Sequence, residues 1–176
     1  MSEKKRVGLI TSGAFISDGL SAEFGKIPPC LIPLGNNHLL YHQVSSIQNL
    51  VDRIFVSLPE GYDLQPIEKE RIANLNIEIL YCDPDVKIGE ALANCINSIG
   101  IYDHEIFILY GDTIIDCLGA FPSDAVTIHP SWGEYKWAKL SHIFGTKADK
   151  YKDFTLSGAF SFSSISTLLR SIVQAK

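Results

Sequence analysis

An aspartate that follows the most continuously apolar segment of the sequence is the residue best placed for metal chemistry. Asp112 lies within Gly111-Asp112-Thr113, directly after the apolar residues 105–110. A carboxylate at the end of a buried strand suits Mg²⁺, which prefers oxygen ligands and neutralises phosphate charge during phosphoryl or nucleotidyl transfer. An aspartate in a turn can also simply bond its own backbone. The position of Asp112 at the end of a buried strand favours the metal-binding role, so we predict that Asp112 is a catalytic residue and a Mg²⁺ ligand.

The loop after the first apolar run is a second place for ligand chemistry. Residues 7–11 are apolar up to Thr11, and Ser12, Gly13 and Ala14 follow. Backbone amides beside a glycine can approach a phosphate or a base closely. We therefore predict that these four residues, from Thr11 to Ala14, bind a nucleotide. The pattern is neither a P-loop nor G-x-G-x-x-G, and a glycine at the end of a strand is common in any case.

Two further groups have spacings that suit ligands. Gly89 and Glu90 open an apolar helical pattern, and a helix N-terminus with a glycine offers free amides to ligand oxygens. His38 and His42 have the i, i+4 spacing of a metal-binding pair on one helical face. No H-E-x-x-H pattern accompanies them, so an ordinary pair of histidines is the preferred interpretation.

Strands and helices alternate over the first 110 residues in the order expected for a parallel sheet covered on both faces. Residues 13–29 show no clear period and are predicted to form a long loop, and Asn36 or Asn37 is expected to cap the helix that follows. A proline near the first turn is expected to start the helix 65–73, and Gly100 is expected to end the helix 88–99. Ser163-Ser164 is expected to cap the closing helix. The predicted strands are 7–11, 53–58, 77–82, 105–110, 125–129 and 158–162, with a further strand around 139–144, and the predicted helices are 39–50, 65–73, 88–99 and a closing helix after 164.

Length and composition fit a single globular domain spanning residues 1–176. Hydrophobic residues make up 46% and charged residues 20% of the chain, and the net charge is −5. This balance argues against a nucleic-acid or membrane-surface binder, which would carry a basic face. No apolar stretch approaches the length of a membrane helix and no secretory signal is evident, so we expect a cytoplasmic protein. The four cysteines lack metal spacing and are expected to be reduced core thiols.

Five segments in this order resemble the N-terminal two thirds of the sugar-phosphate nucleotidyltransferases, also called nucleotide-sugar pyrophosphorylases. The first, Ile27-Pro28-Pro29-Cys30-Leu31-Ile32-Pro33-Leu34-Gly35, is similar to the family's I-P-K-P-L-x-P-x-G. Residues 37–40 stand where the family has G-x-P-L-L. Residues 89–92 resemble the helix start that lies against the nucleoside, 110–113 resemble the metal-binding G-D, and 157–160 resemble a glycine segment that contacts the sugar.

The resemblance implies both a fold and a reaction. The fold would be a Rossmann-like three-layer α/β/α sandwich with a mostly parallel sheet, a type that A-type glycosyltransferases share. The reaction would join a nucleoside triphosphate to a sugar phosphate with Mg²⁺ as cofactor, in many members for capsular or other cell-envelope polysaccharide. Gly158 and Ala159 would then contact the sugar.

Departures from the family pattern keep three functions open. The family's first loop has the pattern G-x-G-S/T-R-L, but residues 13–20 of this chain contain no arginine. Where the family has the lysine of P-K-P, this chain has Pro29, so Lys26 is the nearby cation that remains. The chain can thus be a working nucleotidyltransferase that uses Asp112 and Lys26, a catalytically degenerate binding or assembly module, or a glycosyltransferase that takes a nucleotide sugar. The family usually continues through more strands, so we expect either a fragment of a longer protein or a homodimer in which a partner covers the open sheet edge.

Overall fold

The computed structural model describes residues 5–115, 119–130 and 154–175. These residues form a mixed α/β fold around one six-stranded sheet and a small two-stranded one. In chain order the elements are β1 (Arg6–Thr11), α1 (Asp18–Phe24), the 3₁₀ helix η1 (Pro29–Leu31), β2 (Pro33–Leu34), β3 (Asn37–His38), α2 (Leu39–Ile47), β4 (Arg53–Pro59), α3 (Pro66–Ala73), β5 (Glu78–Cys82), α4 (Ile88–Ile99), β6 (Glu105–Tyr110), β7 (Ala125–Pro130), β8 (Phe154–Phe162) and α6 (Ile165–Gln174).

The main sheet has the strand order β5-β4-β1-β6-β8-β7 and is mostly parallel. β1 pairs in parallel with β4 on one side and with β6 on the other, and β4 pairs in parallel with β5. β8 runs antiparallel to both β6 and β7. The most continuously apolar segment of the sequence forms β6, which is one of the two middle strands. The predicted α/β sandwich is confirmed.

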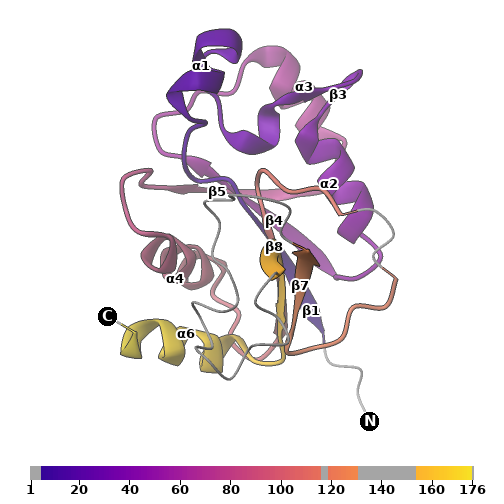
Figure 1. Ribbon diagram of the computed structural model, residues 1–176, viewed down its shortest axis with the longest axis vertical. Helices are drawn as coiled ribbons and strands as arrows, with labels where there is room; N and C mark the ends of the chain where they lie inside the picture. The colour runs from indigo at the N-terminus through magenta and orange to yellow at the C-terminus, as the bar shows by residue number, and fades with distance from the viewer. Residues whose placement is uncertain (1–4, 116–118, 131–153, 176) are drawn as a thin grey trace.

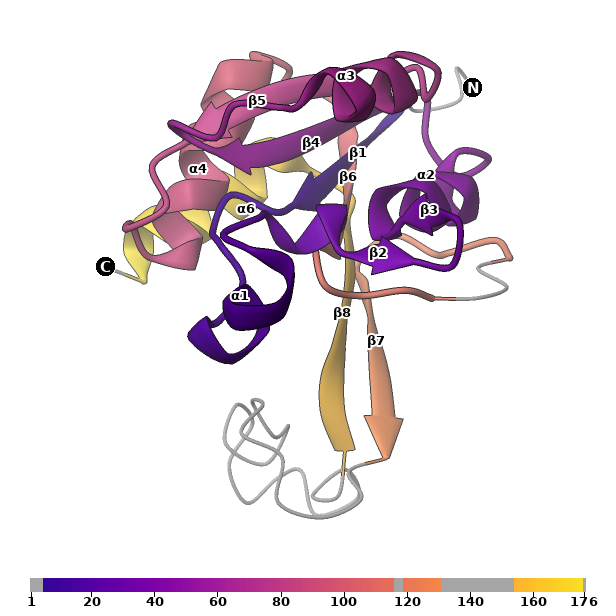
Figure 2. The same cartoon turned by 90° about the horizontal axis from the view of Figure 1, so that it is seen from above.

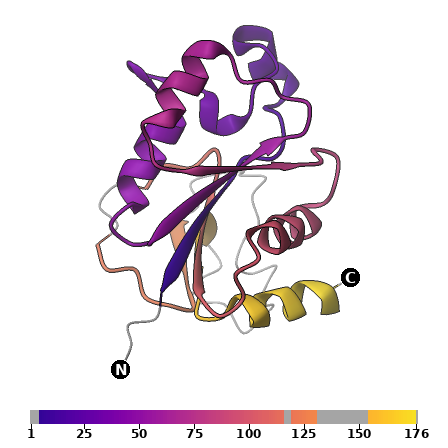
Figure 3. The same cartoon turned by 180° about the vertical axis from the view of Figure 1, so that it is seen from behind.

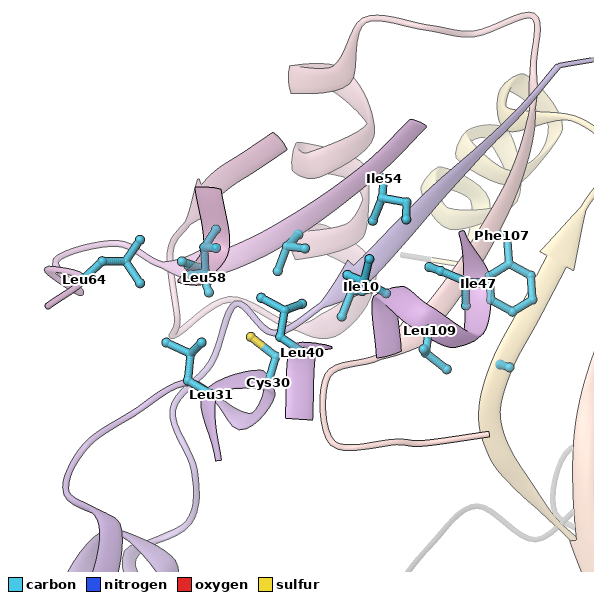
Figure 4. Close-up of a cluster of buried hydrophobic side chains, with 14 residues drawn as sticks. Ile10, Cys30, Leu31, Leu40, Ile47, Ile54, Leu58, Leu64, Phe107 and Leu109 are labelled. Carbon is cyan, nitrogen blue, oxygen red and sulfur yellow. The ribbon is translucent and has the colours of Figure 1, made fainter. Parts of the chain in front are cut away.

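Helices cover both faces of this sheet. α2 and α3 lie on one side, and α4 and α6 lie on the other (Figures 1 and 3). Buried side chains on the α2 side come from β1, β4, β6, η1 and α2, as Figure 4 shows for Ile10, Leu40, Ile47 and Leu109. A second cluster, which includes Cys82 and Cys95, fills the α4 and α6 side. Each of these four helices is thus held against the sheet by apolar side chains.

Local sequence explains where most helices begin and end. Pro66 starts α3, and the Glu68 carboxylate accepts a 2.7 Å hydrogen bond from the backbone N–H of Gln65, which satisfies one free amide of the first turn. The Ser164 hydroxyl caps α6 by accepting from the Thr167 N–H. Gly100 ends α4 in the left-handed conformation. These three boundaries agree with the sequence prediction.

Several sequence predictions in the first third of the chain were wrong. Residues 13–29 are not all loop, because they contain α1, which has no buried residue and therefore no apolar period. Neither Asn36 nor Asn37 caps α2; the N-cap is His38, and Asn37 pairs with Leu34 in the small sheet. α2 ends at Ile47, short of residue 50.

The distal part of the sheet projects away from the helices. β8 begins at Phe154, four residues before the predicted strand, and runs beside β7 out of the body of the domain (Figure 2). The strand predicted around residues 139–144 lies outside the described residues. Within the described ranges, no helix has the length and apolar character required to cross a membrane.

Candidate functional site

The loops after β1 and β6 meet at the carboxyl edge of the sheet. Thr11 and Tyr110 are register partners at the ends of these strands, and the Gly111 N–H donates a 2.8 Å hydrogen bond to the Thr11 carbonyl. A Cβ at Gly111 would lie 2.6 Å from that carbonyl oxygen and 2.7 Å from the Ser12 Cβ. Only glycine therefore permits this approach. Both loops contain residues predicted separately to bind ligands, and the structure brings them into contact.

Ser12 holds this edge together from within. Its backbone N–H donates to the Ser57 hydroxyl at 2.9 Å, and its own hydroxyl accepts from the Cys30 N–H at 3.0 Å. The residue is 1% exposed. Because both groups are engaged inside the protein, Ser12 positions the loop and the start of η1, and its amide is not open to a phosphate as the sequence analysis expected.

A hollow of about 180 Å³ opens beside the β1 loop. Thr11, Gly13 and Ala14, all predicted site residues, form one side of it. The others come from β4, β5, the following loop and α4, namely Ser57, Cys82, Asp83, Pro84, Val86, Ile88, Ala91, Leu92 and Cys95. The walls are mostly apolar, and no lysine or arginine is among these lining residues. Such a hollow suits a flat, uncharged ring better than a phosphate.

A second hollow of about 170 Å³ adjoins the first through Thr11, Ile88 and Leu92. Gly89 lines it at the start of α4, together with Tyr110 and Phe160, whose ring centroids are 5.2 Å apart. Burial, and secondarily the nearby Asp112 charge, raise the pKa of Tyr110, so its hydroxyl remains a hydrogen-bond donor at neutral pH. Glu90, also predicted as a site residue, lies in the first turn of α4 but lines neither hollow.

Asp112 is exposed in a β-turn that closes β6. The Thr113 N–H donates to the Tyr110 carbonyl at 3.0 Å, and the Thr113 hydroxyl donates to an Asp112 carboxylate oxygen at 3.3 Å. Gly158 packs on this turn with φ +89°, where a Cβ would lie 2.6 Å from the Thr113 hydroxyl. The predicted metal ligand and the predicted sugar-binding glycine are therefore neighbours.

Gln43 is a site residue that the sequence analysis missed. Its side chain is 0% exposed, and its amide nitrogen donates to the carbonyls of Tyr110 at 3.0 Å and Thr113 at 2.9 Å. Gln43 thus ties α2 to both ends of the turn that carries Asp112. The available signal was a polar residue within the apolar stripe of the helix, between Leu40 and Val44.

Lys26 and Ala159, two further predicted site residues, also line neither hollow. Lys26 lies with its ammonium 4.4 Å from the centroid of the Phe15 ring, and it lines neither hollow. Phe15 in turn packs edge-on against Tyr62. Ala159, predicted to contact a sugar beside Gly158, is fully buried in the core on the α2 side and is closed to a ligand.

The histidine pair lacks the geometry of a metal site. His38 lies in extended backbone before α2, whereas His42 is inside the helix and its Nε2 lies 3.4 Å from the Leu34 carbonyl. The two therefore do not share a helical face. Burial, followed by the Arg71 charge, lowers the pKa of His38. In the part of the chain that is described, no three His, Cys, Asp or Glu side chains cluster as metal ligands.

The described cysteines are reduced and buried, as predicted. Cys30, Cys82 and Cys95 are free thiols. Burial raises the pKa of Cys30 to about 12, so that thiol stays protonated. Cys82 differs, because a hydrogen bond from the Cys95 thiol lowers its pKa. Cys82 and Cys95 both line the first hollow, and neither was predicted as a site residue.

Comparison with solved structures places the fold among nucleotidyltransferases. No protein-family model and no curated sequence matches the chain. A nucleoside-diphosphate-sugar pyrophosphorylase from Vibrio cholerae RC9 superposes with a TM-score of 0.63 at 15% identity, over 96% of this chain and 78% of that one. An inositol-1-phosphate CTP transferase from T. maritima superposes with a TM-score of 0.58 at 14% identity, over 100% of this chain and 84% of that one. A 4-diphosphocytidyl-2C-methyl-D-erythritol synthase superposes with a TM-score of 0.59 at 11% identity, over 98% of this chain and 81% of that one. The chain has the fold of these enzymes.

Proposed function

We propose that the protein binds a nucleotide with its nucleoside part in the two adjoining hollows, and transfers the nucleotidyl group to a phosphorylated sugar or alcohol. The observation that carries this proposal is the contact between the β1 and β6 loops. It places the wall of the first hollow, at Thr11, Gly13 and Ala14, next to the turn that presents Asp112. Structural neighbours named for CTP and for nucleotide sugars share the fold.

The transfer requires a phosphate oxygen of the acceptor to attack the α-phosphorus of the triphosphate. The bond between the α-phosphorus and the bridging oxygen then breaks, and pyrophosphate leaves. Gly13 and Ala14 would hold the nucleoside through their backbone, Gly89 would admit it beside α4, and Gly158 would lie on the acceptor side of Asp112. The product would be an activated sugar or alcohol, as cell-envelope polysaccharide synthesis requires.

Asp112 fits a magnesium ion that is shared with the substrate. Mg²⁺ in nucleotide enzymes is commonly held by one or two carboxylates together with substrate phosphates and water. The exposed Asp112 carboxylate offers one such ligand, and no described cluster offers three. A bound Mg²⁺ would neutralise charge on the triphosphate. The turn hydrogen bonds from Thr113 and Gln43 hold Asp112 in place for this role.

The described residues that line the hollows include no lysine or arginine, and this sets the expected rate. One well-placed cation on a transferring phosphate is worth on the order of 10³-fold in rate. Among the described residues, Lys26 packs over Phe15 and lines neither hollow. We therefore propose slow transfer, with most of the binding free energy coming from the nucleoside. The same observation favours one second candidate, a module that binds a nucleotide or nucleotide sugar without transferring it.

Calorimetric titration with CTP, UTP, ATP and GTP, each with and without Mg²⁺, tests the proposal. We expect Mg²⁺-dependent binding of one triphosphate, followed by pyrophosphate release when a sugar or alcohol phosphate is added. Binding without pyrophosphate release would favour the binding module, and binding of a nucleotide sugar alone would favour a glycosyltransferase. No binding of any of these compounds would refute the proposal.

A matched pair of substitutions on α4 ties any binding to the hollow. Ala91 lines the first hollow, whereas Ala93, two residues along the same helix, lines neither. Ala91→Phe should fill the space and abolish nucleotide binding, because the added ring has the size of a base. Ala93→Phe should leave binding unchanged. Equal effects of the two substitutions would mean that the nucleotide binds elsewhere.

A further inference from the structure

Two cysteines from different elements face each other in the wall of the first hollow. Cys82 is the last residue of β5 and Cys95 lies in α4, thirteen residues later. They are 5% and 3% exposed, yet both line the hollow of about 180 Å³. Each thiol lies close enough to the other to shift its pKa. Both are free thiols in the lining of one hollow.

The surroundings of the pair make its two members chemically unequal. The Cys95 thiol and the Ser57 hydroxyl form hydrogen bonds that lower the pKa of Cys82, against burial and the charges of Glu60 and Asp83. Cys95 keeps its proton, because its hydrogen bond to Cys82 and its burial raise its own pKa. One sulfur is therefore the nucleophile and the other a protonated partner beside it. This is the arrangement of a reactive and a resolving thiol.

We propose that Cys82 and Cys95 form an oxidation site, at which a hydroperoxide converts the two thiols into a disulfide across the hollow. The Cys82 sulfur attacks one peroxide oxygen, the O–O bond breaks, and with hydrogen peroxide the other oxygen leaves as water. The sulfenic acid formed at Cys82 is then attacked by the Cys95 sulfur, which loses its proton as the S–O bond breaks and a second water leaves. Two thiols and one hydrogen peroxide thus give one disulfide and two waters.

The Cys82 sulfur also connects this chemistry to the loop after β1. Its thiol donates to the Gly13 carbonyl across 3.8 Å, and a Cβ at Gly13 would overlap the same sulfur. A disulfide removes that donor and holds β5 and α4 together. We expect the shape of the hollow and the position of Gly13 to change with it. Oxidation should therefore lower the affinity of whatever ligand fills the hollow.

Peptide mapping of the full chain tests the oxidation site without any nucleotide. The protein is treated with hydrogen peroxide, its remaining thiols are alkylated, and it is digested with trypsin and a glutamate-specific protease. Cleavage after Lys87 separates Cys82 from Cys95, and cleavage after Glu105 separates Cys95 from Cys117. We expect a Cys82–Cys95 cross-linked peptide that dithiothreitol reverses. Cys30, fully buried on the other face of the sheet, serves as the internal control and should stay a thiol.

Single substitutions separate the two roles. Cys95→Ser should stop the reaction at a Cys82 sulfenic acid, which dimedone traps, and Cys82→Ser should leave Cys95 unmodified under the same peroxide dose. Cross-links that join other cysteines, direct oxidation to sulfinic acid in the native protein, or no modification of Cys82 would each overturn the proposal.

The consequence for ligand binding is measured separately. If the proposed function holds, oxidation should weaken nucleotide binding by about tenfold or more, because the hollow changes shape, and reduction should restore it. If the reduced protein binds no nucleotide, the proposed function fails and the mapped disulfide stands by itself. If nucleotide binds equally before and after oxidation, the inferred link to Gly13 is wrong.

Discussion

The side-chain amide of Gln43 donates a hydrogen bond across 2.9 Å to the backbone carbonyl of Thr113, and so joins α2 to the turn that presents Asp112. The two residues are 70 positions apart in the chain. The same amide nitrogen also reaches Tyr110 at the other end of that turn. The predicted metal ligand therefore depends on a buried polar contact from a helix on the face of the sheet.

Replacing Gln43 by methionine keeps the volume and removes the donor. The Thr113 carbonyl would then be buried without this hydrogen bond, so we expect the free energy of unfolding to fall by about 2 kcal/mol. Urea unfolding measures the change. Gln48→Met makes the same replacement at the exposed end of α2 and should shift stability by less than about 0.5 kcal/mol. Equal stability of the two variants would contradict the role given to Gln43.

Gly111→Ala should disrupt the contact between the two loops. The new Cβ would lie within 3 Å of three atoms of Thr11 and Ser12, two of them backbone, which cannot rotate away. We expect a loss of about 2 kcal/mol in unfolding free energy, typical of overpacking, together with loss of ligand binding. Gly19→Ala, in α1, meets no atom within 4 Å and should be neutral or stabilising. Thermal unfolding of the two variants is the measurement.

Most strands and helices could be predicted from the sequence, because the apolar period of an element and its capping residues depend only on residues close to it in the chain. β1, β4 and β6 were predicted from apolar runs, and Gly100 and Ser164 from capping chemistry. α1 was missed because it buries nothing and so has no apolar period.

The site was predicted less completely, since its contacts join distant segments. Thr11, Gly13, Ala14 and Gly89 do line the hollows, but Ser12 is engaged internally by Ser57, 45 residues away. Cys82 and Cys95 were predicted only as core thiols, because nothing in their spacing shows that β5 and α4 bring them together at a hollow.

Asp112→Asn tests the proposed catalytic carboxylate. The amide keeps the size and the turn but loses the charge, so we expect pyrophosphate release to fall by about 10³-fold or more. Stability should not change, since Asp112 is exposed. Asp63→Asn, which removes an exposed carboxylate near the start of α3, is the control. Unchanged turnover in the Asp112 variant would remove this residue from the mechanism.

Introducing a cation at the first hollow should favour the triphosphate over the nucleoside. Ala14 is exposed and lines the hollow, and no lysine or arginine is among the described residues of its wall. Ala14→Arg should raise the affinity for the triphosphate identified by calorimetry by about threefold, the size of an exposed charge pair, and the gain should shrink as salt is added. The affinity for the corresponding nucleoside should not change. Ala14→Gln, with similar length and no charge, controls for packing; an equal gain in that variant would mean that charge is not the cause.

The pH dependence of alkylation tests the unequal thiols of the hollow. The Cys95 hydrogen bond lowers the pKa of Cys82 below its ordinary value of 9.0, in spite of burial and the charges of Glu60 and Asp83. Only the thiolate reacts with iodoacetamide, so the rate at Cys82 should rise with pH to a midpoint below 9.0. Cys95→Ala removes the donor and should move the midpoint upward, whereas Cys95→Ser keeps a donor and should move it less. Mass spectrometry of the Cys82 peptide gives the rates, and a midpoint at or above 9.0 in the unsubstituted chain would show that Cys95 does not activate its neighbour.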